Sequence, residues 1–190
     1  MRAFLAIEVP AEIKVFLGAL QDKLRRSGAD VKWVEPENIH LTLKFLGEIG
    51  DEQAGQVGEA MEEICSLQDD FIIALGELGA FPRLSSPRII WVGLSRGAQE
   101  ATRLAAQLDE RISLFGIPKE KKEFSPHLTI ARTRSVLNMT SLIQCLNDCR
   151  LMPQEKKLEF RSSKVFLIKS TLTPQGPLYE RLKKANLKTS

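Results

Sequence analysis

The sequence holds two histidines, and both open the same short motif. The first copy reads His40-Leu41-Thr42-Leu43, and the second reads His127-Leu128-Thr129-Ile130. Side chains at positions i and i+2 of a β-strand point to the same face. On two neighbouring strands, the pattern therefore predicts a shared centre of two imidazoles and two hydroxyls, with the aliphatic residues behind it in the core.

Two imidazoles can supply one proton donor and one proton acceptor near neutral pH, which the cleavage of a phosphodiester requires. A water molecule loses a proton as it attacks phosphorus, and the departing alkoxide gains one. The hydroxyls of Thr42 and Thr129 can donate hydrogen bonds to the non-bridging oxygens. One such motif alone would favour a structural histidine, but two copies in matched surroundings, which use every histidine of the chain, favour catalysis.

The same pattern does not predict a metal site. Neither motif has a carboxylate beside its histidine, and two imidazoles alone bind Mg²⁺ poorly. A zinc site built on two histidines would need a third ligand, and no Cys or Asp stands at a suitable offset. We therefore expect no metal ion and no other cofactor.

The elements that must position the motifs recur in the same order in both halves of the chain. Each half reads strand, helix, motif strand, helix, strand. This order predicts one α+β domain over residues 1–190, built by internal duplication of two lobes at roughly 1–86 and 87–190. The Pro- and Ser-rich segment 81–87 and the basic segment 119–122 are predicted as loops, and the basic C-terminus as a short helix.

The composition is that of an ordinary soluble protein, with 43% hydrophobic and 27% charged residues. The three cysteines lack metal-ligand spacing and are expected to be reduced, as in the cytoplasm. No apolar run approaches about 20 residues, so we expect no membrane span. The net charge of +3 permits an anionic ligand. We expect a monomer with no obligate protein partner.

Longer stretches around the motifs resemble the RNA 2′,3′-cyclic phosphodiesterases (2′-5′ RNA ligase-like) of the two-histidine (2H) phosphoesterase superfamily. The similarity covers nearly the whole chain and lies mainly in residues 2–7, 33–47, 81–93, 126–132 and 170–179. It implies antiparallel sheets that line a central cleft, with helices packed outside. It further implies the hydrolysis of RNA 2′,3′-cyclic phosphate ends to 2′-phosphomonoesters. His40 would then be the proton donor to the departing 3′ oxygen, and His127 the proton acceptor that activates water.

Three residues next to the motifs can be placed in more than one way. Arg132 either binds the phosphate or a base, or is a surface charge. Phe45 could stack on a base, but strict alternation places both Phe45 and Arg132 on the face opposite the histidines unless each strand ends or bulges there. We therefore favour core packing for Phe45. Alternation places Lys44 on the histidine face, at its rim, whereas Trp33 and Trp91 are expected in the core.

Two other functions stay open at this point. The enzyme could act on a small cyclic nucleotide, such as ADP-ribose 1″,2″-cyclic phosphate, in place of an RNA end. Alternatively, the chain could be a nucleotide-binding module without turnover. The intact His and Thr residues at both motifs argue against pure binding, because a binding module has no need of a general acid.

Overall fold

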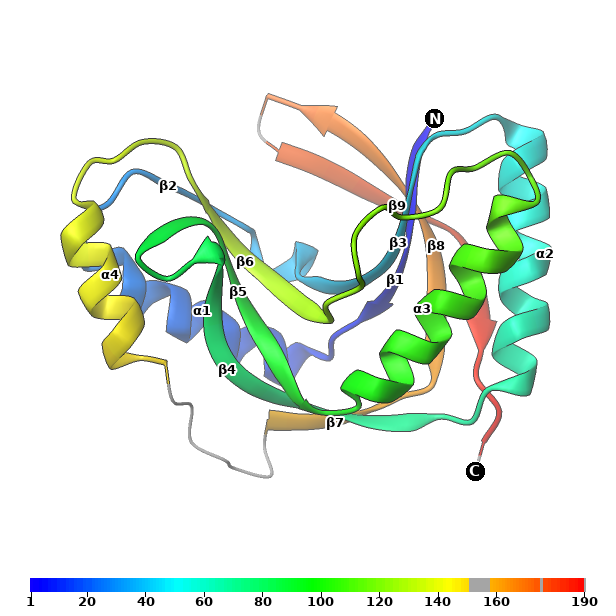
Figure 1. Cartoon of the computed structure of the whole chain (residues 1–190), viewed down its shortest axis with the longest axis horizontal. Helices are drawn as coiled ribbons and strands as arrows, with labels where there is room; N and C mark the ends of the chain where they lie inside the picture. Colours follow the sequence, from blue (N-terminus) through cyan, green and yellow to red (C-terminus); the bar gives the residue numbers. More distant parts are fainter. Residues whose placement is uncertain (151–157, 175, 190) are drawn as a thin grey trace.

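The computed structural model describes residues 1–150, 158–174 and 176–189, which form one curled nine-stranded sheet with helices on its outer side (Figure 1). The strands are β1 (Arg2–Glu8), β2 (Val31–Trp33), β3 (His40–Glu48), β4 (Phe71–Arg83), β5 (Ser86–Arg96), β6 (His127–Thr133), β7 (Glu159–Ser162), β8 (Lys164–Thr173) and β9 (Gly176–Asn186). The helices are α1 (Ala11–Arg25), the short 3₁₀ helix η1 (Pro36–Asn38), α2 (Asp51–Leu67), α3 (Ala98–Ser113) and α4 (Met139–Asp148).

The strand order is symmetric about the two motif strands. It runs β7-β4-β5-β6-β3-β1-β8-β9, with β2 added beside β6. β3 and β6 meet in an antiparallel pair, in which Leu41 lies opposite Leu128. We call β3, β1, β8 and β9 the β3 wing, and β6, β5, β4, β7 and β2 the β6 wing. The antiparallel α+β architecture is confirmed, and the two expected sheets are joined into one by the Leu41–Leu128 pair.

The wings do not coincide with the two halves of the sequence. β2 and β4 come from the first half of the chain and lie in the β6 wing, whereas β8 and β9 come from the second half and lie in the β3 wing. Each half thus gives two strands to the wing of the other half. The lobe boundary near residue 86 stays a prediction.

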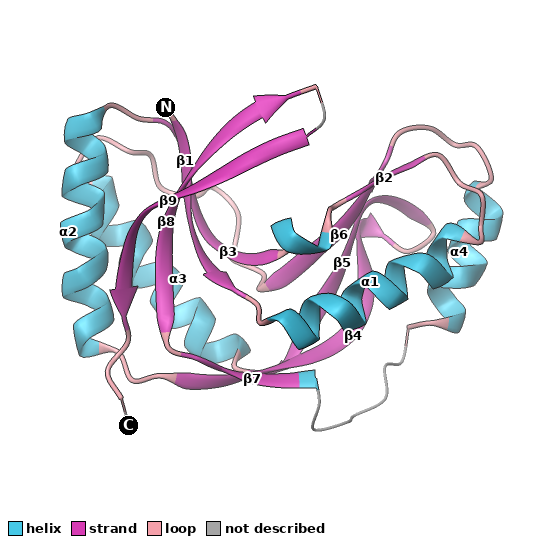
Figure 2. Cartoon of the chain, turned by 180° about the vertical axis from the view of Figure 1, so that it is seen from behind, coloured by secondary structure: helices cyan, strands magenta, loops and turns pink. Residues whose placement is uncertain are grey.

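The helices cover one face of the sheet, which we call the helix face. α2 packs on β8, β9 and α3, and α3 also contacts β3. α1 and α4 pack against each other on the outer side of the β6 wing, which faces the viewer in Figure 2. Five apolar residues of α3 recur at helical spacing and are buried: Ala101, Leu104, Ala105, Leu108 and Ile112. Leu41 and Leu128 face the same core. The opposite side of the sheet carries the four motif side chains, and we call it the histidine face.

Two expected elements were wrong. Segment 81–87 is the end of a β4–β5 hairpin, in which Pro82 and Pro87 occupy partner positions. The two missing N–H groups therefore fall at one point of the ladder, where they interrupt it least. The basic C-terminus is strand β9, paired along its length with β8. Its charged residues are typical of an exposed edge strand, a pattern that carries no clear strand period in the sequence.

Each motif strand has a β-bulge at the equivalent position. On β3, Thr42 lies opposite Ala6 and Lys44 opposite Leu5, so Leu43 has no partner on β1. On β6, the same shift leaves Ile130 without a partner on β5, between Thr129 and Ala131. A bulge adds one residue to a strand and so reverses which face the following side chains take.

The bulge on β3 turns Lys44 onto the helix face, so its expected place at the rim of the histidine face was wrong. Its side chain is buried, with 1% of the residue exposed. The Nζ atom donates to Asp109 Oδ1 at 2.5 Å and to the Pro118 carbonyl at 2.9 Å. The same Asp109 oxygen accepts the Glu120 N–H at 3.2 Å. Lys44 therefore joins β3, α3 and the loop that follows α3.

We predict that Lys44→Ala destabilises the protein by about 3 kcal/mol, because removal of one partner leaves a partly buried carboxylate without its cation. Urea unfolding measures the change, with exposed Lys23→Ala on α1 as the matched control. The double variant Lys44→Met, Asp109→Leu should lose less than Lys44→Ala, because it removes both charges together. A loss below about 0.5 kcal/mol for Lys44→Ala, as at a surface site, would contradict the bracing role.

Candidate active site

The pairing of β3 with β6 brings the two motifs together on the histidine face. Because Leu41 lies opposite Leu128 in an antiparallel pair, the residues on either side of these leucines also lie opposite each other. The resulting cross-strand neighbours are His40 with Thr129 and Thr42 with His127. Such neighbours have β-carbons about 5 Å apart, and diagonal neighbours such as the two histidines about 7–8 Å. Each imidazole therefore has the hydroxyl of the other motif beside it.

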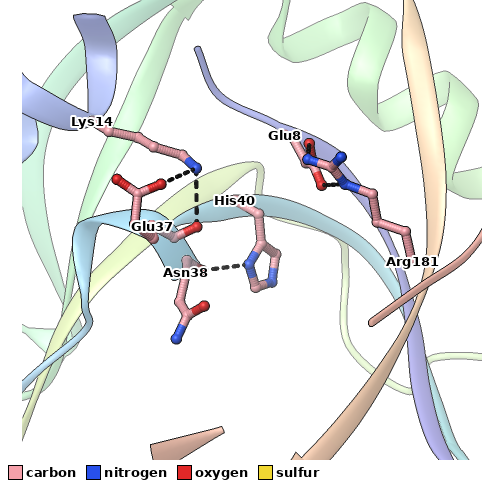
Figure 3. Close-up of polar contacts among 6 residues, drawn as sticks. All are labelled: Glu8, Lys14, Glu37, Asn38, His40 and Arg181. Carbon is pink, nitrogen blue, oxygen red and sulfur yellow. Dashed lines mark hydrogen bonds and ion pairs between the residues drawn. The ribbon is translucent and has the colours of Figure 1, made fainter. Parts of the chain in front are cut away.

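Both imidazoles are oriented by the same local contact. Nδ1 of His40 lies 2.7 Å from the Asn38 carbonyl (Figure 3), and Nδ1 of His127 lies 2.6 Å from the Ser125 carbonyl. A carbonyl oxygen only accepts, so Nδ1 is the donor in both rings. This leaves Nε2 of each ring as the nitrogen that can give or take a proton.

His40 lies in an aromatic environment at the start of β3. The Phe4 ring stacks on it at 4.7 Å with an interplanar angle of 22°, and the Tyr179 ring meets it edge-on at 5.5 Å. Burial lowers the pKa of His40 from its ordinary value of 6.5, while the Asn38 carbonyl and the Glu8 carboxylate act in the opposite direction. The ring is thus neutral when the site is empty near pH 7.

Two ion pairs flank His40 (Figure 3). Glu8 lies opposite His40 in the β1–β3 register and accepts two hydrogen bonds from Arg181, at 2.6 and 2.7 Å. Lys14 donates to the Glu37 carboxylate at 3.2 Å and to the Glu37 carbonyl at 3.0 Å. Lys14 lowers the pKa of His40 less than Glu8 raises it. The nearest charges therefore favour the imidazolium form of His40.

His127 has different neighbours. Phe81 meets its ring edge-on at 5.1 Å, and Trp91 lies at 6.0 Å. Burial lowers the pKa of His127 from 6.5, the Ser125 carbonyl opposes this, and the Arg132 guanidinium lowers the pKa further. A cation thus stands near His127, whereas a carboxylate stands near His40. The two geometrically equivalent imidazoles differ in the charge beside them.

The bulges bring Phe45 and Arg132 to the histidine face. Phe45 is 59% exposed, and its ring centre lies 6.3 Å from that of Phe4. The expected core packing of Phe45 was therefore wrong, because strict alternation fails at the bulge. Arg132 is also exposed, and its charge acts on the pKa of both His127 and Tyr179.

Trp91 was expected in the core, but it forms part of the surroundings of His127. Its ring lies directly over two glycines, and a β-carbon on Gly79 would come within 2.3 Å of it, or on Gly93 within 3.2 Å. Small residues on two strands thus make room for the indole. Trp33 is half-buried on β2, with the Arg25 guanidinium 4.9 Å from its ring.

The sequence reasoning missed Phe4, Glu8, Phe81 and Tyr179 as neighbours of the histidines. All four lie on strands that flank the motif strands or pair beyond them. Phe81 and Tyr179 lie in segments that were not expected to be strands, and the strand order that brings all four residues to the imidazoles is not written in any local pattern. The pair Gly79 and Gly93, with Trp91 between them in the sequence, was the one local signal of close packing beside a ring.

Thr42 and Thr129 are half-buried, and within the described part of the chain neither hydroxyl has a hydrogen-bond partner. Both can therefore donate to a ligand. Among the described residues, no three His, Cys, Asp or Glu side chains gather closely enough to hold a metal ion. No described helix is both long and apolar enough to cross a membrane.

The sequence profile of the LigT-like phosphoesterases matches the chain twice, over residues 7–91 and 92–179. The chain is 37% identical to the RNA 2′,3′-cyclic phosphodiesterase of Aeropyrum pernix, over 87% of this chain and 92% of that protein. It is 35% identical to the protein of the same name from Methanocaldococcus jannaschii, over 96% and 99% of the two chains. The chain belongs to the LigT-like phosphoesterase family of enzymes.

Solved structures agree with this assignment. The crystal structure of a Thermus thermophilus protein matches all of this chain, with a TM-score of 0.82 and 30% sequence identity. The structure of Escherichia coli LigT complexed with 3′-AMP matches 98% of this chain and 97% of its own, with a TM-score of 0.78 and 25% identity. The curled sheet with its outer helices is thus the fold of this family.

We predict that long-range ¹H–¹⁵N NMR finds both neutral imidazoles protonated on Nδ1, with pKa values below 6.5. Because the chain has two histidines, replacing one of them assigns the imidazole signals of both. Glu8→Gln should lower the pKa of His40, because it removes the carboxylate that favours the imidazolium, and Arg132→Gln should raise the pKa of His127, because it removes a cation. An Nε2–H tautomer in either ring, or a pKa above 6.5, would contradict the site as described.

Proposed function

We propose that this protein hydrolyses RNA 2′,3′-cyclic phosphate ends to 2′-phosphomonoesters without a metal ion. The observation that carries the proposal is the cross-strand arrangement of the motifs, in which two imidazoles with free Nε2 atoms each stand beside a free threonine hydroxyl. The names of the relatives support the choice of substrate, since those from A. pernix and M. jannaschii are RNA 2′,3′-cyclic phosphodiesterases.

In the proposed reaction, His127 takes a proton from a water molecule as its oxygen bonds to phosphorus. His40 gives a proton to the 3′ oxygen as the bond between this oxygen and phosphorus breaks. The phosphate stays on the 2′ oxygen, and the proton balance is restored when the two imidazoles exchange protons with solvent. The charges beside the rings support this polarity, because Glu8 favours a proton on His40 and Arg132 disfavours one on His127.

The other residues of the histidine face hold the substrate in this proposal. Thr42 and Thr129 donate to the non-bridging oxygens, where charge must be stabilised in the transition state. Arg132 supplies a fixed cation for phosphate oxygens. Beyond Phe4, Phe45 offers an exposed ring for a base of the strand. The anionic substrate also raises the pKa of a nearby His40, which offsets the effect of burial.

Hydrolysis of small cyclic nucleotides is a second candidate. E. coli LigT, which is 25% identical to this chain, has been crystallised with 3′-AMP, and a mononucleotide would occupy the same centre. The monomeric state and a cytoplasmic location are also our proposals. Three free cysteines support a reducing compartment.

We predict that the wild-type protein converts a cyclic-ended oligonucleotide to its 2′-phosphate in EDTA, and that His40→Ala and His127→Ala each lose about 10²–10⁴-fold in rate. Phosphorus NMR identifies the product, and Lys23→Ala serves as the control. A substrate with sulfur in place of the 3′ oxygen separates the two roles, because a thiolate leaves without protonation. His40→Ala should recover activity on it, and His127→Ala should not. Recovery by His127→Ala alone, or a 3′-phosphate product from the natural substrate, would reverse the assignment of proton donor and proton acceptor. If the wild type gave no product, the proposed hydrolysis would be refuted.

We predict that kcat/KM is greatest below pH 6.5. The rate falls on the acid side when His127 becomes protonated, and on the alkaline side when His40 loses its proton. Burial lowers both pKa values in the free enzyme, so both limbs lie at acid pH. The kcat profile should shift to higher pH, since the bound phosphate favours the imidazolium of His40. Stopped assays across pH 4–9 measure the profile. A kcat/KM optimum above pH 7.5 would be incompatible with His40 as the proton donor and His127 as the proton acceptor.

A further inference from the structure

A hollow of ≈ 430 Å³ lies beside Phe45, next to the proposed catalytic centre. One wall is the stretch of β3 from Phe45 to Gly47. The other wall is the loop after α3, from Ile117 to Lys122. We call this feature the Phe45 hollow. Of the residues that the proposed function uses, only Phe45 lines this hollow.

A row of aromatic rings leads from the catalytic centre to this hollow. Phe4 stacks on His40 at 4.7 Å, and Phe45 follows at 6.3 Å from Phe4. Phe45 thus stands between the surroundings of His40 and the hollow, and 59% of it is exposed. An exposed phenylalanine at this place offers a flat surface to a ligand.

The loop wall is fixed to the rest of the molecule. The buried Lys44 ammonium binds both the Asp109 carboxylate and the Pro118 carbonyl, and the same carboxylate accepts the Glu120 N–H. Lys119 pairs with Glu110 of α3. These four polar contacts hold the wall of the hollow against β3 and α3.

The charge of the wall suits an anion. Lys121 and Lys122 are exposed, and within the described part of the chain neither has an ion-pair partner. Glu120 is the acidic side chain of the same wall. An aromatic ring beside unpaired lysines is the combination with which proteins bind single-stranded nucleic acid, the ring taking a base and the lysines a phosphate.

We propose that the Phe45 hollow binds the nucleotide that precedes the cyclic-phosphate end of an RNA strand. Its base lies against Phe45, and the phosphodiester that joins it to the terminal nucleotide faces Lys121 and Lys122. This inference rests on the proposed function and adds a substrate class to it. The enzyme acts on strands in preference to cyclic mononucleotides, because a mononucleotide leaves the hollow empty.

Three substrates that share one cyclic end test the inference: a mononucleotide, a dinucleotide and a trinucleotide. For the wild type, kcat/KM should rise about tenfold from mononucleotide to dinucleotide, the effect of one stacked base, and change little for the trinucleotide. Two variants remove the proposed contacts: the double variant Lys121→Ala, Lys122→Ala, and Phe45→Leu, which keeps an apolar side chain without a flat ring. In both, the ratio of kcat/KM on the dinucleotide to kcat/KM on the mononucleotide should fall toward one. Lys23→Ala should keep the wild-type ratio.

A dinucleotide with a neutral methylphosphonate linkage isolates the lysine contact. The wild type should lose part of its preference for this substrate, whereas the double lysine variant should treat both dinucleotides alike. The slope of log kcat/KM against log salt should also decrease in that variant, by about one for each lost phosphate contact. Equal rates of the wild type on the mononucleotide and the dinucleotide, or equal losses on both substrates in the variants, would overturn the inference. Absence of hydrolysis of every substrate would instead refute the proposed function.

Discussion

The active centre depends on the contact between β3 and β6 at Leu41 and Leu128. Both leucines are buried on the helix face, and their pairing places each histidine opposite the threonine of the other motif. A shift of one residue would turn the leucines out of the core and the imidazoles into it, so the hydrophobic core specifies the register of the centre. Since this junction is also the middle of the strand order, everything on either wing is positioned relative to it.

The fold supplies two geometrically equivalent imidazoles, and the charges around them make the two different. Nδ1 of each ring is held by the carbonyl two residues earlier, so neither ring is chemically distinct by itself. Glu8 on β1 stands near one ring, and Arg132 of the second motif stands near the other. A reaction that needs one donor and one acceptor requires such a difference, which strand pairing alone cannot provide.

The two bulges explain why residues next to the motifs were placed less well than the motifs themselves. Up to Thr42 and Thr129, strict alternation holds and identifies the histidine face correctly. The next residue is the extra residue of the bulge, and the side chains after it take the opposite faces from those expected. Lys44 is therefore buried and Phe45 exposed. Nothing in the types of Leu43 or Ile130 signals a bulge, because both residues suit a regular strand equally well. The buried Lys44–Asp109 contact was likewise invisible, since its partners lie on elements far apart in the chain.

The sequence by itself determined the chemistry of the centre and the class of the fold. The two matched motifs and their strand period specified which four side chains share a face, and the helical spacing of apolar residues specified the outer helices. The tertiary structure alone decided what surrounds the histidines: the stacking of Phe4, the ion pair of Glu8, the indole of Trp91 and the outward turn of Phe45. The physical reason is that local periodicity fixes the direction of a side chain relative to its own strand. The neighbours that it meets depend on strand order and register, which the packing of the whole core selects.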